Sequence, residues 1–182
     1  MELLPEYFPA LKGDFAKKLV CLTLILYSFT FTIIYLHKLT YKKYRIDCPK
    51  GIFYTNACAS VFNSTIKYIR ENSKPEDTVA VMDEGPVINY CTDRPINLKY
   101  YVMSPHMTDT YGQERIISDF SKNMPEYIIV TNNFYPLEGY WGIDYAQKVM
   151  LFVSQNYNPV QKYEESESAT GMKVTIFKKR PR

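Results

Sequence analysis

The sequence predicts an α/β protein in which a single N-terminal transmembrane helix precedes a layered α/β domain with a mostly parallel sheet and a C-terminal antiparallel hairpin. Three observations predict this fold. An uncharged apolar run occupies residues 19–36, short β-branched runs alternate with helical periodicity from residue 55, and two strand-like runs close the chain. Helices that alternate with buried strands pack on the faces of one sheet, and strands joined in this way run parallel.

The apolar run at residues 19–36, LVCLTLILYSFTFTIIYL, contains neither charge nor proline. A helix rises about 1.5 Å per residue, so the run just reaches the roughly 17 residues that cross a hydrocarbon core about 30 Å thick. A cleaved signal sequence and a buried soluble helix are the alternatives. A signal has an apolar part of about 7–15 residues that ends at small residues, whereas this run ends at bulky Tyr35 and Leu36. We therefore expect a retained single-pass anchor.

The whole chain divides into segments of distinct character. We expect a leader or loop remnant at residues 1–18, the transmembrane helix at 19–36, a basic juxtamembrane connector at 37–54, a soluble α/β domain at 55–178 and a basic tail at 179–182. The net charge is +3, from 22 basic and 19 acidic residues. This balance does not predict the basic face of a nucleic-acid-binding protein. The expected partners are therefore the lipid bilayer and no nucleic acid.

The first half of the soluble domain alternates helices with strands. Apolar residues recur at helical spacing from residue 55 until Asn72, Ser73 and a proline end the helix. Residues 78–82 (TVAVM) are almost all apolar and β-branched, which predicts a buried strand. A proline suited to a first helical turn precedes a short helix at residues 87–91, and a second strand is expected at residues 96–102.

The second half continues the same alternation. The strongest strand pattern in the chain is YIIVT, and an aromatic loop follows it. The expected elements are, in order, a loop at 104–110, a helix at 112–122, a strand at 127–131, the aromatic loop at 132–141, a helix at 143–155 and two strands at 160–163 and 172–177. The last two strands are joined by a short acidic stretch, which predicts an antiparallel hairpin at the end of the chain.

The spacing of the cysteines and the absence of standard motifs exclude several kinds of site. Cys21 lies in the apolar run, while Cys48, Cys58 and Cys91 lie outside it without C-x-x-C spacing. Neither a structural zinc site nor another cofactor is expected. One disulfide among the three outer cysteines is compatible with a non-cytoplasmic domain, but the sequence does not select the pair. The standard phosphate-binding, metalloprotease and nucleophile motifs are absent, so no catalytic residue is predicted.

The best-placed polar cluster follows the TVAVM strand. Asp83 and Glu84 stand at its carboxyl end, and Tyr90 and Arg94 come shortly after. Open α/β sheets bind ligands at the carboxyl ends of their strands. A carboxylate there accepts hydrogen bonds from sugar hydroxyls, and an arginine holds a phosphate. These four residues are our candidate ligand-binding residues; a structural carboxylate–arginine pair that fixes the loop is the alternative.

An N-glycosylation motif occurs at Asn63, Ser64 and Thr65. The motif falls inside the first expected helix of the domain, whereas glycosylated asparagines lie on accessible loops. We therefore do not expect it to be used.

Several motifs together resemble the carboxyl-terminal part of GT-C glycosyltransferases, relatives of the protein mannosyltransferases and of the lipid A aminoarabinose transferase. The likeness covers residues 19–177. The likeness begins with a last span followed by a basic collar. It continues through three stretches, which are IRENSKPEDTVAVMDEGPVINYCTDRPINLKYY, MPEYIIVTNN and FVSQNYNPVQKYEE. Its more specific parts are the acidic residues after the strand, the Tyr-x-x-x-Arg element from Tyr90 to Arg94, the Pro-Glu-Tyr triplet and the late Asn156-Tyr157.

The resemblance implies a role in transfer from polyprenyl-phosphate sugars. In that family the catalytic aspartate lies in a loop near the first spans, so none of the family's catalytic residues maps onto this chain, which is expected to be inactive alone. The resemblance also places the domain outside the cytoplasm and implies a multi-span partner or a missing N-terminal portion. The larger number of basic residues after the span favours the opposite orientation. We follow the family, because preceding spans orient a last span.

Two other functions are compatible with the sequence. The first is a free-standing, membrane-anchored module that binds a glycan or a lipid headgroup through Glu84, Tyr90 and Arg94. The second is a non-catalytic scaffold that packs on a multi-span protein and touches no substrate.

Overall fold

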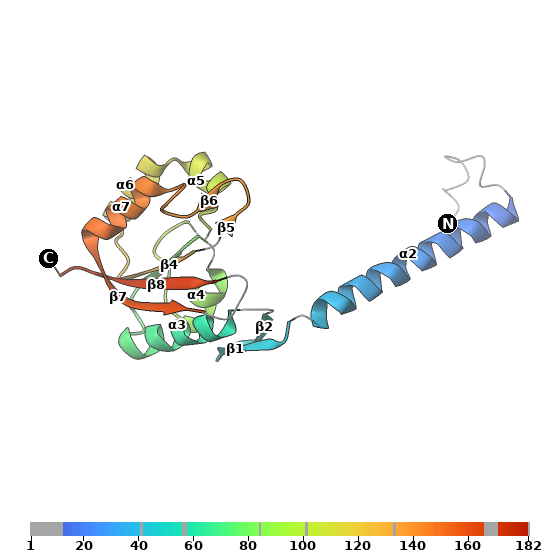
Figure 1. Ribbon diagram of the computed structural model, residues 1–182, viewed down its shortest axis with the longest axis horizontal. Coiled ribbons are helices and arrows are strands. Elements are labelled where there is room, and N and C mark those ends of the chain that lie inside the picture. Colours follow the sequence, from blue (N-terminus) through green and yellow to red (C-terminus); the bar gives the residue numbers. More distant parts are fainter. Residues whose placement is uncertain are drawn as a thin grey trace. The chain divides into compact units, whose positions relative to one another are not determined.

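The computed structural model describes residues 13–181 apart from 41, 56–57, 84, 101, 133 and 166–170. The chain forms two units, Met1–Lys43 and Tyr44–Arg182, which are described separately (Figure 1). The first unit contains the helix α2, Asp14–Thr40, and the second contains the α/β domain.

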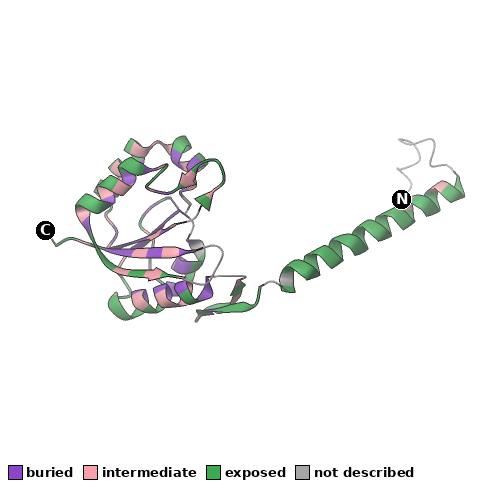
Figure 2. Ribbon diagram, viewed as in Figure 1, coloured by how far each residue is buried: buried purple, intermediate pink, exposed green. Residues whose placement is uncertain are grey.

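Helix α2 is long and apolar enough to cross a membrane. It extends the predicted run at both ends to 27 residues, and its described apolar side chains are exposed apart from half-buried Ala16 and Val20 (Figure 2). The hydroxyls of Thr23 and Thr32 donate hydrogen bonds to the carbonyls of Leu19 and Ser28, at 2.9 and 2.8 Å. Hydroxyls bonded back to their own helix in this way are tolerated in lipid. The apolar helix is confirmed, while its crossing of a membrane stays a prediction.

The domain is built on a four-stranded mixed sheet. Its strands are β3 (Val79–Met82), β4 (Tyr127–Thr131), β8 (Lys173–Lys179) and β7 (Tyr157–Glu164), in that spatial order. Only β3 and β4 pair in parallel, whereas β4 with β8 and β8 with β7 pair antiparallel. The α/β fold and the C-terminal hairpin are confirmed. The mostly parallel sheet is wrong, because the hairpin joins the sheet beside β4 and the predicted strand at 96–102 is not formed in the residues described there.

Helices cover both faces of this sheet. The helices are α3 (Ala59–Asn72), α4 (Pro86–Thr92), α5 (Pro105–Tyr111), α6 (Gln113–Lys122) and α7 (Gln147–Asn156). The predicted loop at 104–110 is therefore wrong over most of its length, because Pro105 starts a helical turn. The last helix begins later than predicted, because Ala146 adopts a left-handed backbone with φ of 57°.

The alternation of side chains along the strands divides the core in two. Ala80, Met82 and Ile128 face one side and pack with α6 and α7. Val79, Val81 and Ile129 face the other side and pack with α3 and α4. Figure 1 shows α6 and α7 on the opposite side of the sheet from α3. Fully burying one such side chain stabilises the fold by about 1.5–3 kcal/mol, so the three-layer arrangement follows from the period-2 pattern.

Two small hairpins lie outside the main sheet. The first pairs β1 (Tyr44–Cys48) with β2 (Gly51–Thr55), within the segment we expected to be a connector. The second pairs β5 (Phe134–Tyr135) with β6 (Gly139–Tyr140), within the predicted aromatic loop. In Figure 1 both lie toward the right-hand end of the domain, β5 and β6 on the side of α5 and α6, and β1 and β2 on the side of α3.

Candidate functional site

Asp83 occupies the predicted position at the carboxyl end of β3, but its side chain is completely buried. Its backbone is left-handed, with φ of 76°. The Tyr145 hydroxyl donates a hydrogen bond to Oδ1 of Asp83 at 3.2 Å, and the Met103 amide donates to the Asp83 carbonyl at 2.7 Å. Burying a carboxylate is costly unless hydrogen bonds compensate it. The Asp83 carboxylate therefore acts as an internal anchor for the segment that carries Tyr145.

That segment, residues 132–146, closes over the ends of β3 and β4. Trp141 is 4% exposed and belongs to the core between the sheet and α7. The rings of Tyr135 and Tyr145 meet edge to face, with centroids 6.0 Å apart. The Thr131 hydroxyl at the end of β4 donates to the Met82 carbonyl at 3.3 Å. The edge of the sheet at which α/β proteins usually bind ligands is thus filled by the protein's own aromatic side chains.

Gly85 explains how α4 follows β3 so closely. A Cβ atom at Gly85 would lie 2.1 Å from Cγ1 of Val81, so any other residue would collide with the strand. Asn89 of α4 then donates through Nδ2 to the Val79 carbonyl at 3.0 Å. The turn between β3 and α4 is therefore tightly packed. Glu84, the second predicted ligand residue, lies in this turn but outside the described residues.

Arg94 uses its guanidinium to fasten the end of α3. Its Nε donates to the Ser73 hydroxyl at 2.9 Å, and its terminal nitrogens donate to the Ser73 and Thr92 carbonyls at 3.0 and 3.1 Å. Helix ends leave carbonyls without partners, and a cation there also opposes the negative end of the helix dipole. Arg94 thus fastens the end of α3, and its partners are carbonyls and a hydroxyl rather than the carboxylate of the structural pair that we gave as the alternative.

Tyr90 lies apart from Asp83, on the exposed side of α4. Its hydroxyl donates to the Lys50 carbonyl at 3.3 Å, and its ring meets Phe53 edge to face at 5.8 Å. The Lys50 ammonium lies 5.6 Å from the Tyr90 ring centroid and pairs with Asp93. This ammonium holds the pKa of the Asp93 carboxyl below its usual value. The contacts of Tyr90 therefore join α4 to the β1–β2 hairpin.

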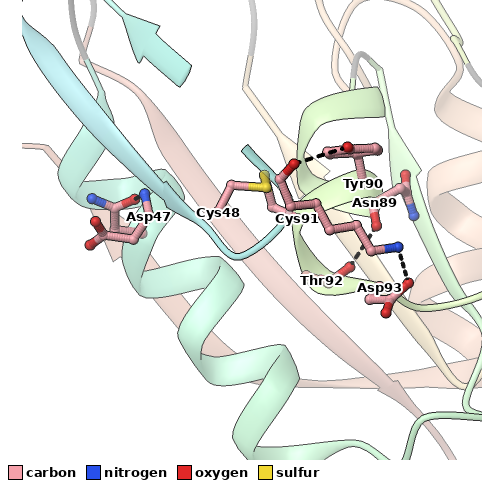
Figure 3. Close-up of a disulfide and its surroundings, with 9 residues drawn as sticks. Asp47, Cys48, Asn89, Tyr90, Cys91, Thr92 and Asp93 are labelled. Carbon is pink, nitrogen blue, oxygen red and sulfur yellow. Dashed lines mark hydrogen bonds and ion pairs between the residues drawn. A yellow bond between two sulfur atoms is a disulfide. The ribbon is translucent and has the colours of Figure 1, made fainter. Parts of the chain in front are cut away.

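A disulfide between Cys48 and Cys91 joins the same two elements (Figure 3). Their Cα atoms are 4.8 Å apart, within the usual range for disulfides, and 43 residues apart in sequence. Ile46 and Cys91 are buried together with Ile66 of α3. The Asn63 amide supports the hairpin from α3, because it accepts from the Asp47 N–H at 2.7 Å and donates to the Arg45 carbonyl at 3.1 Å.

These contacts also bear on the glycosylation motif. The Nδ2 atom that would carry the glycan is the donor to Arg45, and Thr65 of the motif is completely buried. The geometry thus supports our prediction that the motif is not used.

An open hollow lies beside Arg94 on the described surface. It has a volume of ≈ 630 Å³ and is lined by Asp47, Asn63, Lys67, Arg70, Glu71 and Arg94. Charges of both signs line it, and Lys67 and Glu71 lie 4.0 Å apart. Within the described ranges, no group of three histidine, cysteine or acidic side chains could hold a metal ion.

The structure separates the three predicted residues that it describes. Asp83 is internal, Tyr90 lies at the β1–β2 hairpin, and Arg94 lies at the end of α3.

No family model, no curated protein and no solved structure matches the chain. The resemblance to GT-C glycosyltransferases accordingly stays a proposal.

The sequence analysis missed Tyr145 and the Cys48–Cys91 pairing. A signal for the hairpin was present, since Cys48-Pro49-Lys50-Gly51 places turn residues between two short β-prone runs. With that hairpin recognised, Cys48 would have been assigned to a β-strand rather than to a connector. Tyr145 gave no such signal, because its contact with Asp83 joins residues 62 apart in sequence.

Proposed function

We propose that this chain is the membrane-anchored terminal portion of a GT-C glycosyltransferase that uses polyprenyl-phosphate sugars, with a non-cytoplasmic domain that contributes no catalytic group. The observation that carries the non-cytoplasmic placement is the Cys48–Cys91 disulfide, while the link to glycosyl transfer rests on the sequence resemblance. Disulfides persist in oxidising compartments and are rare in the cytoplasm. This one fastens the hairpin that begins four residues after the end of α2. A disulfide in that place supports an α2 that delivers the domain to the non-cytoplasmic side.

The contacts of Asp83 and Arg94, two of the predicted ligand residues, support a structural rather than a catalytic role for the domain. The Asp83 carboxylate is completely buried and holds the segment above the sheet, and the Arg94 guanidinium fastens α3. A general base must reach the proton that it removes, and buried Asp83 has no such access. The domain therefore acts on the membrane part of the enzyme, by packing on it or by shaping acceptor access.

The free-standing binding module has less support. It relied on Glu84, Tyr90 and Arg94 as one ligand site. Arg94 is the cation that would hold a phosphate, but its donors are used by Ser73 and Thr92. A ligand would have to replace those hydrogen bonds and release the end of α3.

The decisive test measures sugar transfer in membranes of the source cell. Transfer from a polyprenyl-phosphate sugar is compared between the wild-type strain, a strain lacking residues 44–182, and the deleted strain complemented with the full chain. We expect the deletion to lower transfer at least tenfold and the full chain to restore it. The purified full chain in nanodiscs serves as a control and should show no transfer by itself.

Two results would contradict the proposal. Unchanged transfer after deletion would remove the link to glycosyl transfer. Turnover of the sugar donor by the purified chain would show that it carries its own catalytic group.

A further inference from the structure

The segment that closes over the sheet exposes four apolar side chains. Phe134, Leu137, Tyr140 and Ile143 are 60, 101, 39 and 70% exposed. Phe134 and Tyr140 are cross-strand partners of the β5–β6 hairpin, and their ring centroids lie 5.1 Å apart. Ile143 follows in the next turn, where its amide donates to the Tyr140 carbonyl at 3.2 Å. We name these four side chains the apolar tip.

Leu137 contributes nothing visible to the fold. Its side chain is as exposed as in an extended peptide, and its φ of 88° lies in the region that favours glycine. A branched side chain at positive φ costs the backbone energy, and an exposed leucine gains no burial. Departures from local preference of this kind concentrate at functional positions. The function of Leu137 therefore lies outside the folded domain.

The base below the apolar tip is well held. Asp144 accepts the Tyr140 N–H at 2.8 Å, and Gly139 has a φ of 82° with Asp144 so close that a Cβ atom would lie 2.2 Å from it. Trp141 is buried in the core, and Tyr145 bonds to Asp83. Because buried contacts hold the chain directly after the hairpin, the four apolar side chains stand on a defined platform.

The β1–β2 hairpin lies toward the same end of the domain in Figure 1. On its outer face Ile52 is 64% and Tyr54 is 51% exposed, and Arg45 is the cross-strand partner of Tyr54. Lys42 and Lys43 directly precede the hairpin. Aromatic and basic side chains together are typical of surfaces that lie at lipid headgroups, where basic groups meet anionic lipids. In the sequence only residues 41–43 separate this hairpin from α2.

We propose that the apolar tip enters the headgroup region of the same bilayer that α2 crosses. This inference depends on the membrane anchoring in the proposed function. Exposed apolar surface on a domain that follows an apolar helix fits a lipid surface, and the basic residues of the connector complement anionic headgroups. Glu138, which is exposed beside Leu137, limits insertion to the headgroup region, because a charge in the hydrocarbon core is costly. The chain thus contacts the membrane at two places, through α2 and through the apolar tip of the domain.

The test places a fluorophore at the apolar tip of the full chain. Leu137→Cys in a Cys21→Ser background supplies one reactive thiol among the described cysteines, because Cys58 is buried and Cys48 and Cys91 are bonded. The protein is labelled with an environment-sensitive dye and placed in phosphatidylcholine–phosphatidylglycerol nanodiscs, with or without lipids carrying a quencher near the headgroup. Leu151→Cys on α7 is the matched control, because Leu151 is 58% exposed. Native Cys21 in α2, labelled in the wild type, reports the anchor.

We expect quenching at position 137 to be at least three times that at position 151, with a blue-shifted emission. Ile143→Cys in the same background should behave like Leu137→Cys. Equal, weak quenching at 137, 143 and 151 would overturn the inference. That result would hold both for a tip that binds nothing and for a tip that binds a protein partner. In that case a quenched Cys21 leaves the proposed anchoring intact, whereas an unquenched Cys21 contradicts the anchoring as well.

Discussion

The two small hairpins at one end of the domain are held in opposite ways. The β1–β2 hairpin is fastened by the Cys48–Cys91 disulfide and by two hydrogen bonds with the Asn63 amide, which accepts one and donates the other. The β5–β6 hairpin is fastened from below by Trp141 and by the Tyr145–Asp83 hydrogen bond, while its outer side chains are exposed. A covalent bond thus secures the hairpin nearest α2 in sequence, and buried side chains secure the one that carries the apolar tip.

The comparison shows which interactions make each hairpin rigid. A disulfide acts mainly by restricting the unfolded chain, so its effect grows with the length of the loop that it closes. A buried polar contact acts in the folded state, and it is costly to break because the remaining partner loses a hydrogen bond inside the protein. The two hairpins should therefore respond to different perturbations, and the following changes separate them.

The largest expected effect comes from removing the disulfide. With the cysteines 43 residues apart, the loop-entropy relation gives about 4 kcal/mol, and a measured loss of about 2–4 kcal/mol in the free energy of unfolding is expected for Cys48→Ser with Cys91→Ser. Urea unfolding of the full chain in nanodiscs measures it. Reductant should destabilise the wild type equally and leave the double variant unchanged, and Cys21→Ser is the control. A wild-type midpoint that is insensitive to reductant would contradict the disulfide.

Tyr145→Phe tests the hold on the second hairpin. The change keeps the ring but removes the donor to buried Asp83, so the free energy of unfolding should fall by about 1–3 kcal/mol. Tyr140→Phe, on the exposed hairpin, is the matched control and should change it by less than about 0.5 kcal/mol. Equal stability of the two variants would mean that the hydrogen bond to Asp83 does not secure the segment.

The fold was predictable where the side-chain period was strong. VAVM and YIIVT form β3 and β4 as expected, and both are buried on two faces. The sheet order was not predictable, because the place of the C-terminal hairpin beside β4 depends on long-range packing of residues such as Ile176 against α3. Sequence patterns report local periodicity and not which strand becomes a neighbour.

The candidate site was predictable in position but not in chemistry. Asp83 does follow β3 at the edge of the sheet, as the alternation of strands and helices implied. Nothing local indicated that a tyrosine 62 residues later would cover it. From the sequence, Arg94 likewise looked available to bind a ligand. Its actual partner, a carbonyl at the end of α3, could not be inferred, because the contact exists only when α3 and the loop after α4 lie together in the fold.

Asn63→Ala weakens the non-covalent support of the first hairpin. It removes one hydrogen bond to each of the Arg45 carbonyl and the Asp47 N–H, and a loss of about 1 kcal/mol is expected because the groups are partly solvated. Lys67→Ala, on the exposed face of the same helix, is the control. Thermal unfolding measured with the disulfide intact and reduced should show a larger effect of Asn63→Ala in the reduced protein. No difference between Asn63→Ala and Lys67→Ala would rule out this support.

The smallest effect concerns the Lys50–Asp93 pair at the rim of the first hairpin. The Asp93 pKa is lowered by its hydrogen bond to Lys50, so the folded state favours the carboxylate. This contribution is present above the ordinary carboxyl pKa and is lost as the pH falls through the lowered value. Asp93→Asn should therefore lower the melting temperature slightly at pH 7 and low salt, and by progressively less as the pH falls below the ordinary carboxyl pKa. A difference that stays constant as the pH falls, or that persists in high salt, would contradict an ion-pair effect.

The most direct test of the account is the thiol state of the chain in intact cells. In a Cys21→Ser strain, cells receive a membrane-impermeant maleimide of high mass, either directly or after a membrane-impermeant reductant, and the chain is then resolved by size. A non-cytoplasmic domain with a Cys48–Cys91 disulfide predicts no added label without reductant and two added labels after it. Two labels that appear only after the cells are opened, with no need for reductant, would place the domain in the cytoplasm with free thiols and contradict the account.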